Sequence, residues 1–145
     1  MGFRFSLAAV LRFRESVEKR EELALQKLLL EMSRMRREIE RLGTEIVRAH
    51  QAQNQAMQTP LAAVHLQSML KEIDAIADRK KALIASLAAL DREREIQTKK
   101  YQAAHRDRQM LSDMQSKQLD VYEQERARAQ QKFLDDIFAA RAQRG

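Results

Sequence analysis

The side chains best suited to chemistry in this sequence are three histidines at positions 50, 65 and 105. Their spacings match no metal-binding pattern. A reversal of the chain between His50 and His65 would bring these two together, but two histidines without a third ligand make a poor metal site. We therefore interpret the histidines as solvated surface side chains and expect no metal site.

Two pairs of acidic residues, Asp135 with Asp136 and Glu123 with Glu125, are the remaining candidates for acid–base chemistry. Their surroundings favour charges on a helix face over a catalytic dyad. The sequence has no glycine-rich phosphate loop, so the chain is not expected to hydrolyse nucleotides. It has no cysteine, which excludes a disulfide framework and thiol chemistry and fits a reducing cytoplasm. We expect no enzyme activity and no cofactor.

The composition is that of a long helical protein. There is one proline among 145 residues, and Ala, Leu, Glu, Lys, Arg and Gln dominate, which is typical of coiled coils. Aromatic residues make up 5% of the chain, too few for a thick globular core. No apolar run approaches the roughly 18 residues that a membrane span needs.

The net charge of +6 raises the question of nucleic-acid binding. A DNA-binding helix usually concentrates its basic residues on one face, whereas the surplus here is spread over the whole chain. The densest basic cluster is interleaved with acidic residues: Arg34, Arg36, Arg37 and Arg41 alternate with Glu31, Glu38, Glu40 and Glu45. We interpret this cluster as a solvated helix face with weak ion pairs and expect no nucleic-acid partner.

Apolar residues recur at alternating steps of three and four, which is the coiled-coil pattern. In the first half the two rows are Leu25, Met32, Ile39, Ile46 and Leu28, Met35, Leu42, Ala49, Ala56. In the second half they are Leu66, Ile73, Leu87 and Met69, Ile76, Leu83, Leu90, continuing weakly through Tyr101, Ala104 and Leu111. The pattern predicts helices over about residues 6–56 and 61–141, joined by a turn at about 57–60. Thr59 and Pro60 are expected to cap and open the second helix.

The helix lengths predict the architecture. At 1.5 Å per residue the first helix is roughly 75 Å long and the second roughly 120 Å. Folding back at the turn places residue 5 opposite about residue 112, so roughly the last 25 to 30 residues would lack a partner within the chain. We predict an all-α fold: a long antiparallel two-helix coiled-coil hairpin with a protruding C-terminal helix. The whole chain, 1–145, is expected to form a single coiled-coil stalk domain.

Both ends of the chain carry a family resemblance. Phe3–Arg12 (FRFSLAAVLR) resembles the opening of the flagellar export protein FliJ, and Tyr122–Arg126 (YEQER) followed by Gln131–Asp136 (QKFLDD) resembles its far end. The resemblance implies a cytoplasmic, non-enzymatic stalk, peripheral at the inner face of the bacterial cell membrane. Such a stalk inserts its paired ends into a hexameric export ATPase. It also contacts the cytoplasmic domain of the membrane export gate and couples energy to protein export. The resemblance leaves open whether export chaperones are further partners.

The resemblance and the apolar surface that the hairpin leaves uncovered suggest two sets of binding residues. The expected ATPase-binding residues are Phe3, Phe5, Val10, Leu11, Tyr122, Phe133, Leu134 and Ile137. The expected gate-binding residues, near the turn, are Leu42, Ile46, Ala49, Met69, Ile73, Ile76 and Lys80. Most of the second set also fit the contact between the two helices, where they would serve the fold alone.

Three alternatives remain open at the level of the sequence. One is the stalk of a virulence-type secretion system, and another is a general coiled-coil scaffold. The third is a membrane-surface protein, for which an N-terminal basic amphipathic helix would be the anchor. The residues of that anchor would be Phe3, Phe5, Leu7, Val10, Leu11 and Phe13 with Arg4, Arg12 and Arg14.

Overall fold

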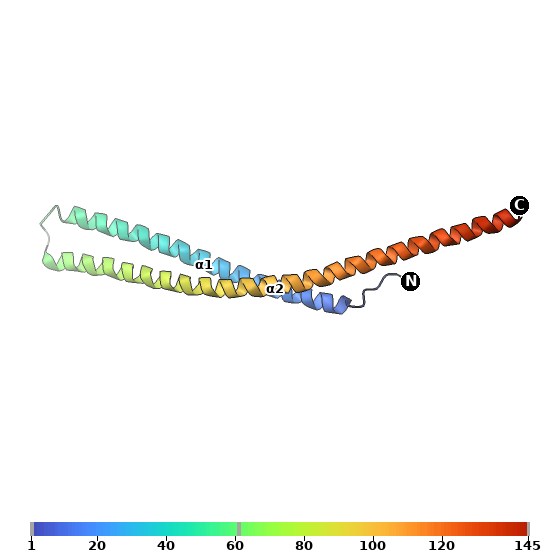
Figure 1. Ribbon diagram of the computed structural model, residues 1–145. Helices are drawn as coiled ribbons and strands as arrows, with labels where there is room; N and C mark the ends of the chain where they lie inside the picture. Colours follow the sequence, from blue (N-terminus) through green and yellow to red (C-terminus); the bar gives the residue numbers. More distant parts are fainter. Residues whose placement is uncertain (1, 61, 145) are drawn as a thin grey trace. The chain divides into compact units, whose positions relative to one another are not determined.

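The computed structural model describes residues 2–60 and 62–144 and consists of two helices in this range (Figure 1). Helix α1 spans Ala8–Ala56 and has 49 residues, and α2 spans Ala63–Arg144 and has 82. The two helices pack against each other as a hairpin, and no strand occurs among the described residues. The predicted all-α fold is confirmed.

Contacts within the chain divide it into two compact units. Unit 1 combines the residues up to Glu21 with those from Tyr101 onward, and unit 2 is Glu22–Lys100. Each helix contributes to both units. The single stalk domain expected over residues 1–145 stays a prediction.

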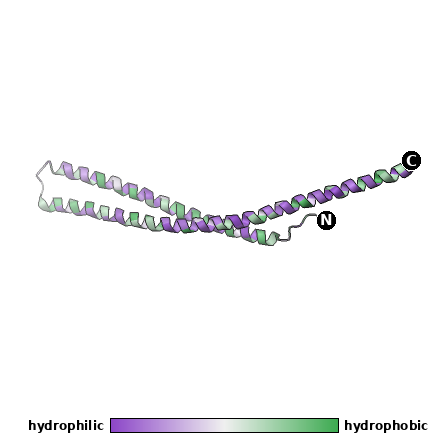
Figure 2. Cartoon of the chain, viewed as in Figure 1, coloured by the Kyte–Doolittle hydropathy of each residue, from purple (hydrophilic) through white to green (hydrophobic). Residues whose placement is uncertain are grey.

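In unit 2, α1 and α2 bury the predicted apolar rows between them. Met32 and Leu42 are each 1% exposed and Ile73 is also buried, while the other members of the rows are half-buried. Hydrophobic residues recur along both helices among hydrophilic ones (Figure 2). This is the expected outcome of a heptad pattern, because positions three and four apart return to the same helix face. We call this line of contact the seam.

One seam position of α2 holds a lysine instead of an apolar residue. Lys80 falls seven residues after Ile73 in the same row and is half-buried. It lies over Gly43 of α1, where a Cβ atom would be 3.4 Å from the lysine Nζ. A glycine with no side chain therefore leaves room for the lysine stem at this level of the seam.

The turn of unit 2 differs from the sequence prediction. Thr59 donates hydrogen bonds from both its amide (3.3 Å) and its hydroxyl (3.1 Å) to the carbonyl of Ala56, so it closes the end of α1 instead of capping α2. The first helical bonds of α2 go from His65 and Leu66 to the carbonyl of Ala62. The assignment of Thr59 and Pro60 to the start of α2 was wrong, because the chain needs more residues to reverse direction. Leu61, the predicted first residue of the second helix, lies outside the described residues.

Unit 1 joins residues 2–7, which we call the N-terminal segment, and the first turns of α1 to α2. Phe5 and Leu11 are buried, as is Ala104 of α2. A turn precedes α1, with the Ala8 amide bonded to the Phe5 carbonyl at 3.1 Å. The Phe3 ring reaches Tyr122, so the pairing extends beyond the expected match of residue 5 with about residue 112. Residues 2–7 lie outside α1, and non-helical chain covers up to ~3.3 Å per residue against 1.5 Å in a helix.

Beyond Tyr122 the helix α2 continues to Arg144. In this C-terminal extension, defined as residues 123–144, every residue is exposed except the half-buried Ile137. The seam pattern degrades in the same region, where polar residues take the places of apolar ones. The predicted protruding helix is therefore a feature of unit 1.

Candidate functional site

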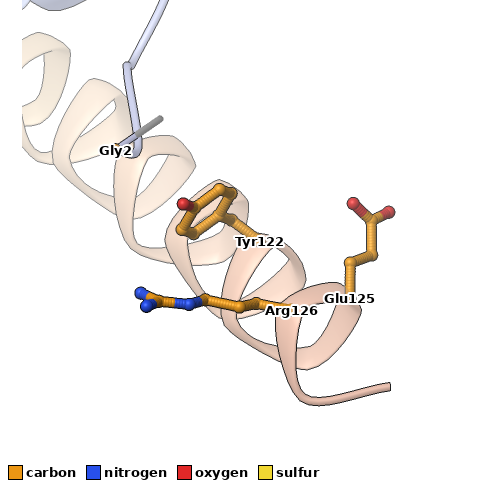
Figure 3. Close-up of a pocket in the computed structure, with 4 residues that line it drawn as sticks. All are labelled: Gly2, Tyr122, Glu125 and Arg126. Atoms are coloured by element: carbon orange, nitrogen blue, oxygen red, sulfur yellow. The ribbon is translucent and has the colours of Figure 1, made fainter. Parts of the chain in front are cut away.

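Aromatic side chains hold the N-terminal segment against α2. The rings of Phe3 and Tyr122 have centroids 5.6 Å apart and an interplanar angle of 48°, within the range of favourable aromatic pairs. A shallow hollow beside them is lined by Gly2, Tyr122, Glu125 and Arg126. Figure 3 shows the Tyr122 ring turned toward Gly2, the Arg126 side chain running below the ring, and Glu125 directed away. The segment therefore ends on the last turn of α2 before the extension.

Ion pairs connect α1 to α2 further along unit 1. Nη1 of Arg14 lies 3.3 Å from Oδ2 of Asp107, and Nε of Arg108 donates to Oε2 of Glu18 at 2.6 Å. His105 joins the second pair, with Nδ1 at 3.7 Å from Oε1 of Glu18. The Arg108 hydrogen bond is the largest cause that lowers the pKa of Glu18, and the same bond raises the pKa of Arg108. These pairs link the turns of the two helices that face each other in unit 1.

Exposed apolar side chains gather near the end of the C-terminal extension. Phe133 is 66% exposed, and Leu134 and Phe138 are exposed as well. Acidic and basic residues surround them, including Lys132 and Asp135. Large apolar side chains grouped in this way on a helix indicate a surface that another protein covers.

The eight residues predicted to bind an ATPase fall into two groups in the structure. Phe5 and Leu11 are buried within unit 1, and Phe3 and Tyr122 contact each other, so these four support the fold of the free chain. Val10, Phe133 and Leu134 are exposed and Ile137 is half-buried, so these are open to contact. Phe138 is exposed beside this second group but was absent from the predicted set. The spacing of apolar residues at 133, 134, 137 and 138, which places Phe138 four residues after Leu134, was the signal that could have included it.

The residues predicted to bind an export gate lie along the seam of unit 2. Leu42 and Ile73 are buried and the remaining five, Ile46, Ala49, Met69, Ile76 and Lys80, are half-buried. Two of them, Leu42 and Ile76, also line a groove between the helices. The other lining residues of that groove are Arg41, Glu45, Glu72, Ala75 and Arg79. The polar residues on its rim could not be recognised as a group from the sequence, because they come from both helices.

The remaining chemistry of the surface is sparse. His50 and His65 are exposed, and in the described part of the chain no group of three or more His, Cys, Asp or Glu residues could hold a metal ion. None of the described helices is long and apolar enough to cross a membrane. The N-terminal anchor considered above would need Phe5 and Leu11 at the lipid surface, yet both pack inside unit 1.

Two helices paired along heptad rows, with apolar side chains exposed on an extension, place this chain in the class of coiled-coil proteins that act through contacts. The family model of the flagellar FliJ protein matches residues 3–145, and the chain belongs to the FliJ family. The family is a non-catalytic component of the flagellar export apparatus, which assigns the chain to that apparatus. No curated protein and no solved structure matched the chain.

Proposed function

We propose that this chain is the stalk of the flagellar export apparatus. In this proposal the C-terminal extension inserts into a hexameric export ATPase, and unit 2 contacts the cytoplasmic domain of the membrane export gate. The stalk would lie in the cytoplasm at the inner face of the membrane, help the ATPase to assemble and turn over, and couple its work to protein export. Membership of the FliJ family supports the flagellar setting over a virulence-type system.

The exposed apolar group of the extension is the observation that carries the ATPase contact. Phe133, Leu134 and Phe138 expose large apolar surfaces on a helix that no other described segment of unit 1 covers. Burying such side chains against a partner stabilises a complex by roughly 1.5–3 kcal/mol for each fully buried residue. These side chains can therefore contribute binding energy to the ATPase contact without being withdrawn from the packing of unit 1.

The groove of unit 2 supports the gate contact. Its floor includes the half-buried Ile76, and its rim carries Glu72 and Arg79, so it offers apolar surface and both signs of charge. Seam residues that are largely covered, such as Leu42 and Ile73, would support this groove from below instead of touching the gate.

The ATPase contact is tested by replacing Phe133 and Leu134 with alanine. The matched control replaces Ile84 and Ile96, two exposed apolar residues of unit 2. We expect the extension variant to lose most of its stimulation of the purified ATPase, measured as phosphate release and as hexamer formation. The control should stimulate as well as the unaltered chain. Equal stimulation by both variants would count against the insertion of the extension.

The gate contact needs a separate measurement. Glu72→Ala and Arg79→Ala change exposed rim residues, so helix content and melting temperature should stay nearly constant. We expect them to weaken binding to the cytoplasmic domain of the gate while binding to the ATPase is retained. Loss of both interactions together would contradict a specific gate site.

A further inference from the structure

The outward face of α1 in unit 2 carries a column of basic residues with a strict period of seven. Lys27, Arg34, Arg41 and Arg48 are all exposed and follow one another at seven-residue intervals. The seam has the same period, so the column keeps a constant angle to the seam along the coiled coil.

A second column, of opposite sign, runs beside the first. Glu31, Glu38 and Glu45 each follow a basic residue of the first column by four positions. Arg41 bonds both neighbours, with Nη2 at 2.6 Å from Oε1 of Glu38 and Nη1 at 3.1 Å from Oε2 of Glu45. Glu38 is half-buried and its Oε1 also lies 3.6 Å from Nη2 of Arg79 on α2, so the acidic column runs along the edge of this face that adjoins the second helix.

Two hollows lie along these columns and repeat the same arrangement. One is lined by Lys27, Leu30, Glu31 and Arg34, and the other by Arg41, Thr44, Glu45 and Arg48. Both sets follow the order i, i+3, i+4 and i+7, and the second is the first moved by two heptads. Four residues in this order form the hole that receives one side chain of a facing helix in a coiled coil. Each hole here has basic residues at both ends, an acidic residue on one side, and Leu30 or Thr44 on the other.

We propose that this face docks a helix of a partner protein as a third strand of the coiled coil. The partner helix would place one apolar side chain per heptad into the holes. Its acidic residues would face the column of Lys27, Arg34 and Arg48, and its basic residues would face the glutamate column. This site is separate from the extension and borders the groove between the helices, with which it shares Arg41 and Glu45, and it goes beyond the proposed stalk function.

The two columns of opposite charge favour a protein helix as the partner over a polyanionic surface such as a membrane or a nucleic acid. Anionic lipid headgroups and nucleic-acid phosphates carry only negative charge, so Glu31, Glu38 and Glu45 would repel them along the full column. A helix can carry both signs in separate columns, as the flanking positions of coiled coils do. Only such a partner satisfies both columns at once.

The experiment uses the full-length chain and two synthetic helical peptides of four heptads. The matched peptide carries leucine at the hole-filling position, glutamate along one flank and lysine along the other. The control peptide has the same composition, but glutamate and lysine change places in every second heptad, so half of its contacts are repulsive in either orientation. We expect the matched peptide to bind about tenfold more tightly at physiological ionic strength, measured by calorimetry.

Two triple variants with the same change in net charge locate the binding site. Lys27→Gln/Arg34→Gln/Arg48→Gln removes three of the four cations of the column and leaves Arg41, which pairs with Glu38 and Glu45. Lys71→Gln/Arg92→Gln/Lys99→Gln removes three exposed cations of α2 in the same unit. The first should abolish the preference for the matched peptide and the second should retain it.

Each remaining outcome overturns the proposal. One is equal binding of the two peptides, and another is a preference that survives the first variant. Phosphatidylglycerol vesicles and a DNA duplex serve as further probes. Binding to either that is lost in the first variant, with no preference between peptides, would assign the column to that polyanion instead.

Discussion

Phe5→Ala tests whether the N-terminal segment is held to α2 by packing. Phe5 is 7% exposed although it precedes α1, so its burial depends entirely on unit 1. Fully burying a phenylalanine side chain contributes roughly 1.5–3 kcal/mol, and truncation adds a cavity term where the surroundings cannot relax. That second term should be small here, because a non-helical segment at the end of the chain can settle into the space. We expect a loss of about 2–3 kcal/mol, confined to the pairing of the segment with α2.

Native-state hydrogen exchange measures this loss where it occurs. The amides of Ala8 and Leu11, bonded to the carbonyls of Phe5 and Leu7, report on the first turn of α1. A loss of about 2–3 kcal/mol corresponds to a fall in protection of roughly 30- to 150-fold, up to the protection that these amides have in the unaltered chain. Amides of unit 2 should change little.

Phe13→Ala is the matched control for this experiment. It removes the same side chain from the same region, but Phe13 is 60% exposed. Its ring lies 5.9 Å from the Arg14 guanidinium, a contact worth about 0.5–1 kcal/mol at an exposed site. Protection should therefore fall by less than about fivefold. Similar losses in both variants would refute the idea that burial of Phe5 holds the segment.

Three further predictions concern the rest of the coiled coil. Gly43→Ala should stabilise the chain by about 0.5–1 kcal/mol and raise its melting temperature by about 2–4 °C, because the new Cβ meets Lys80 only at ordinary contact distance. Leu42→Ala should cost about 2–4 kcal/mol in urea unfolding, because that side chain is fully covered in the seam. Glu18→Gln should cost about 1 kcal/mol at neutral pH through the lost pair with Arg108. Since the pKa of Glu18 is lowered from 4.5, the pair stabilises the fold above that value, and the difference from the variant should vanish as the pH falls below it.

Controls separate these effects from general changes of composition. Val47→Ala, at an exposed position of α1, should cost far less than Leu42→Ala. Glu123→Gln changes an exposed carboxylate of the extension and should cost far less stability at neutral pH than Glu18→Gln. A Gly43→Ala chain that melts earlier would indicate that this glycine is a hinge or that the lysine stem cannot shift. Persistence of the Glu18→Gln difference at pH values well below 4.5 would contradict the ion-pair explanation.

The seam could be predicted from the sequence because its apolar residues recur every three or four positions. Met32, Leu42 and Ile73 were assigned to the contact by spacing alone, and they are buried. The extension was predictable for the opposite reason, since polar residues replace the apolar rows where the pairing ends. Both inferences depend only on which residues recur on one face of a helix.

The details that residue spacing could not predict arise where the chain is not helical or where two helices must be aligned with each other. The reach of Phe3 to Tyr122 depends on the conformation of residues 2–7, for which a helical repeat gives no information. The hydroxyl of Thr59 could serve the helix before it or the one after it, and local sequence alone does not distinguish them. The pairing of Glu18 with Arg108 depends on the relative stagger of the two helices in unit 1, which the period of a single helix does not give.

The position of Lys80 beside Gly43 also restricts which helices can pair through the seam. The end of Lys80 lies beside Gly43 in the hairpin, and a slip by one heptad would set it against the much larger side chain of Arg36 or His50. In a parallel homodimer through the same rows, Lys80 would meet Lys80 of the second copy, and two ammonium groups would repel each other inside the contact. Lys80, with Arg94 two heptads further along the same row, thus makes alternative pairings costly and leaves the antiparallel return of the same chain as the favoured arrangement. The polar interruption of the seam therefore disfavours self-association through the seam.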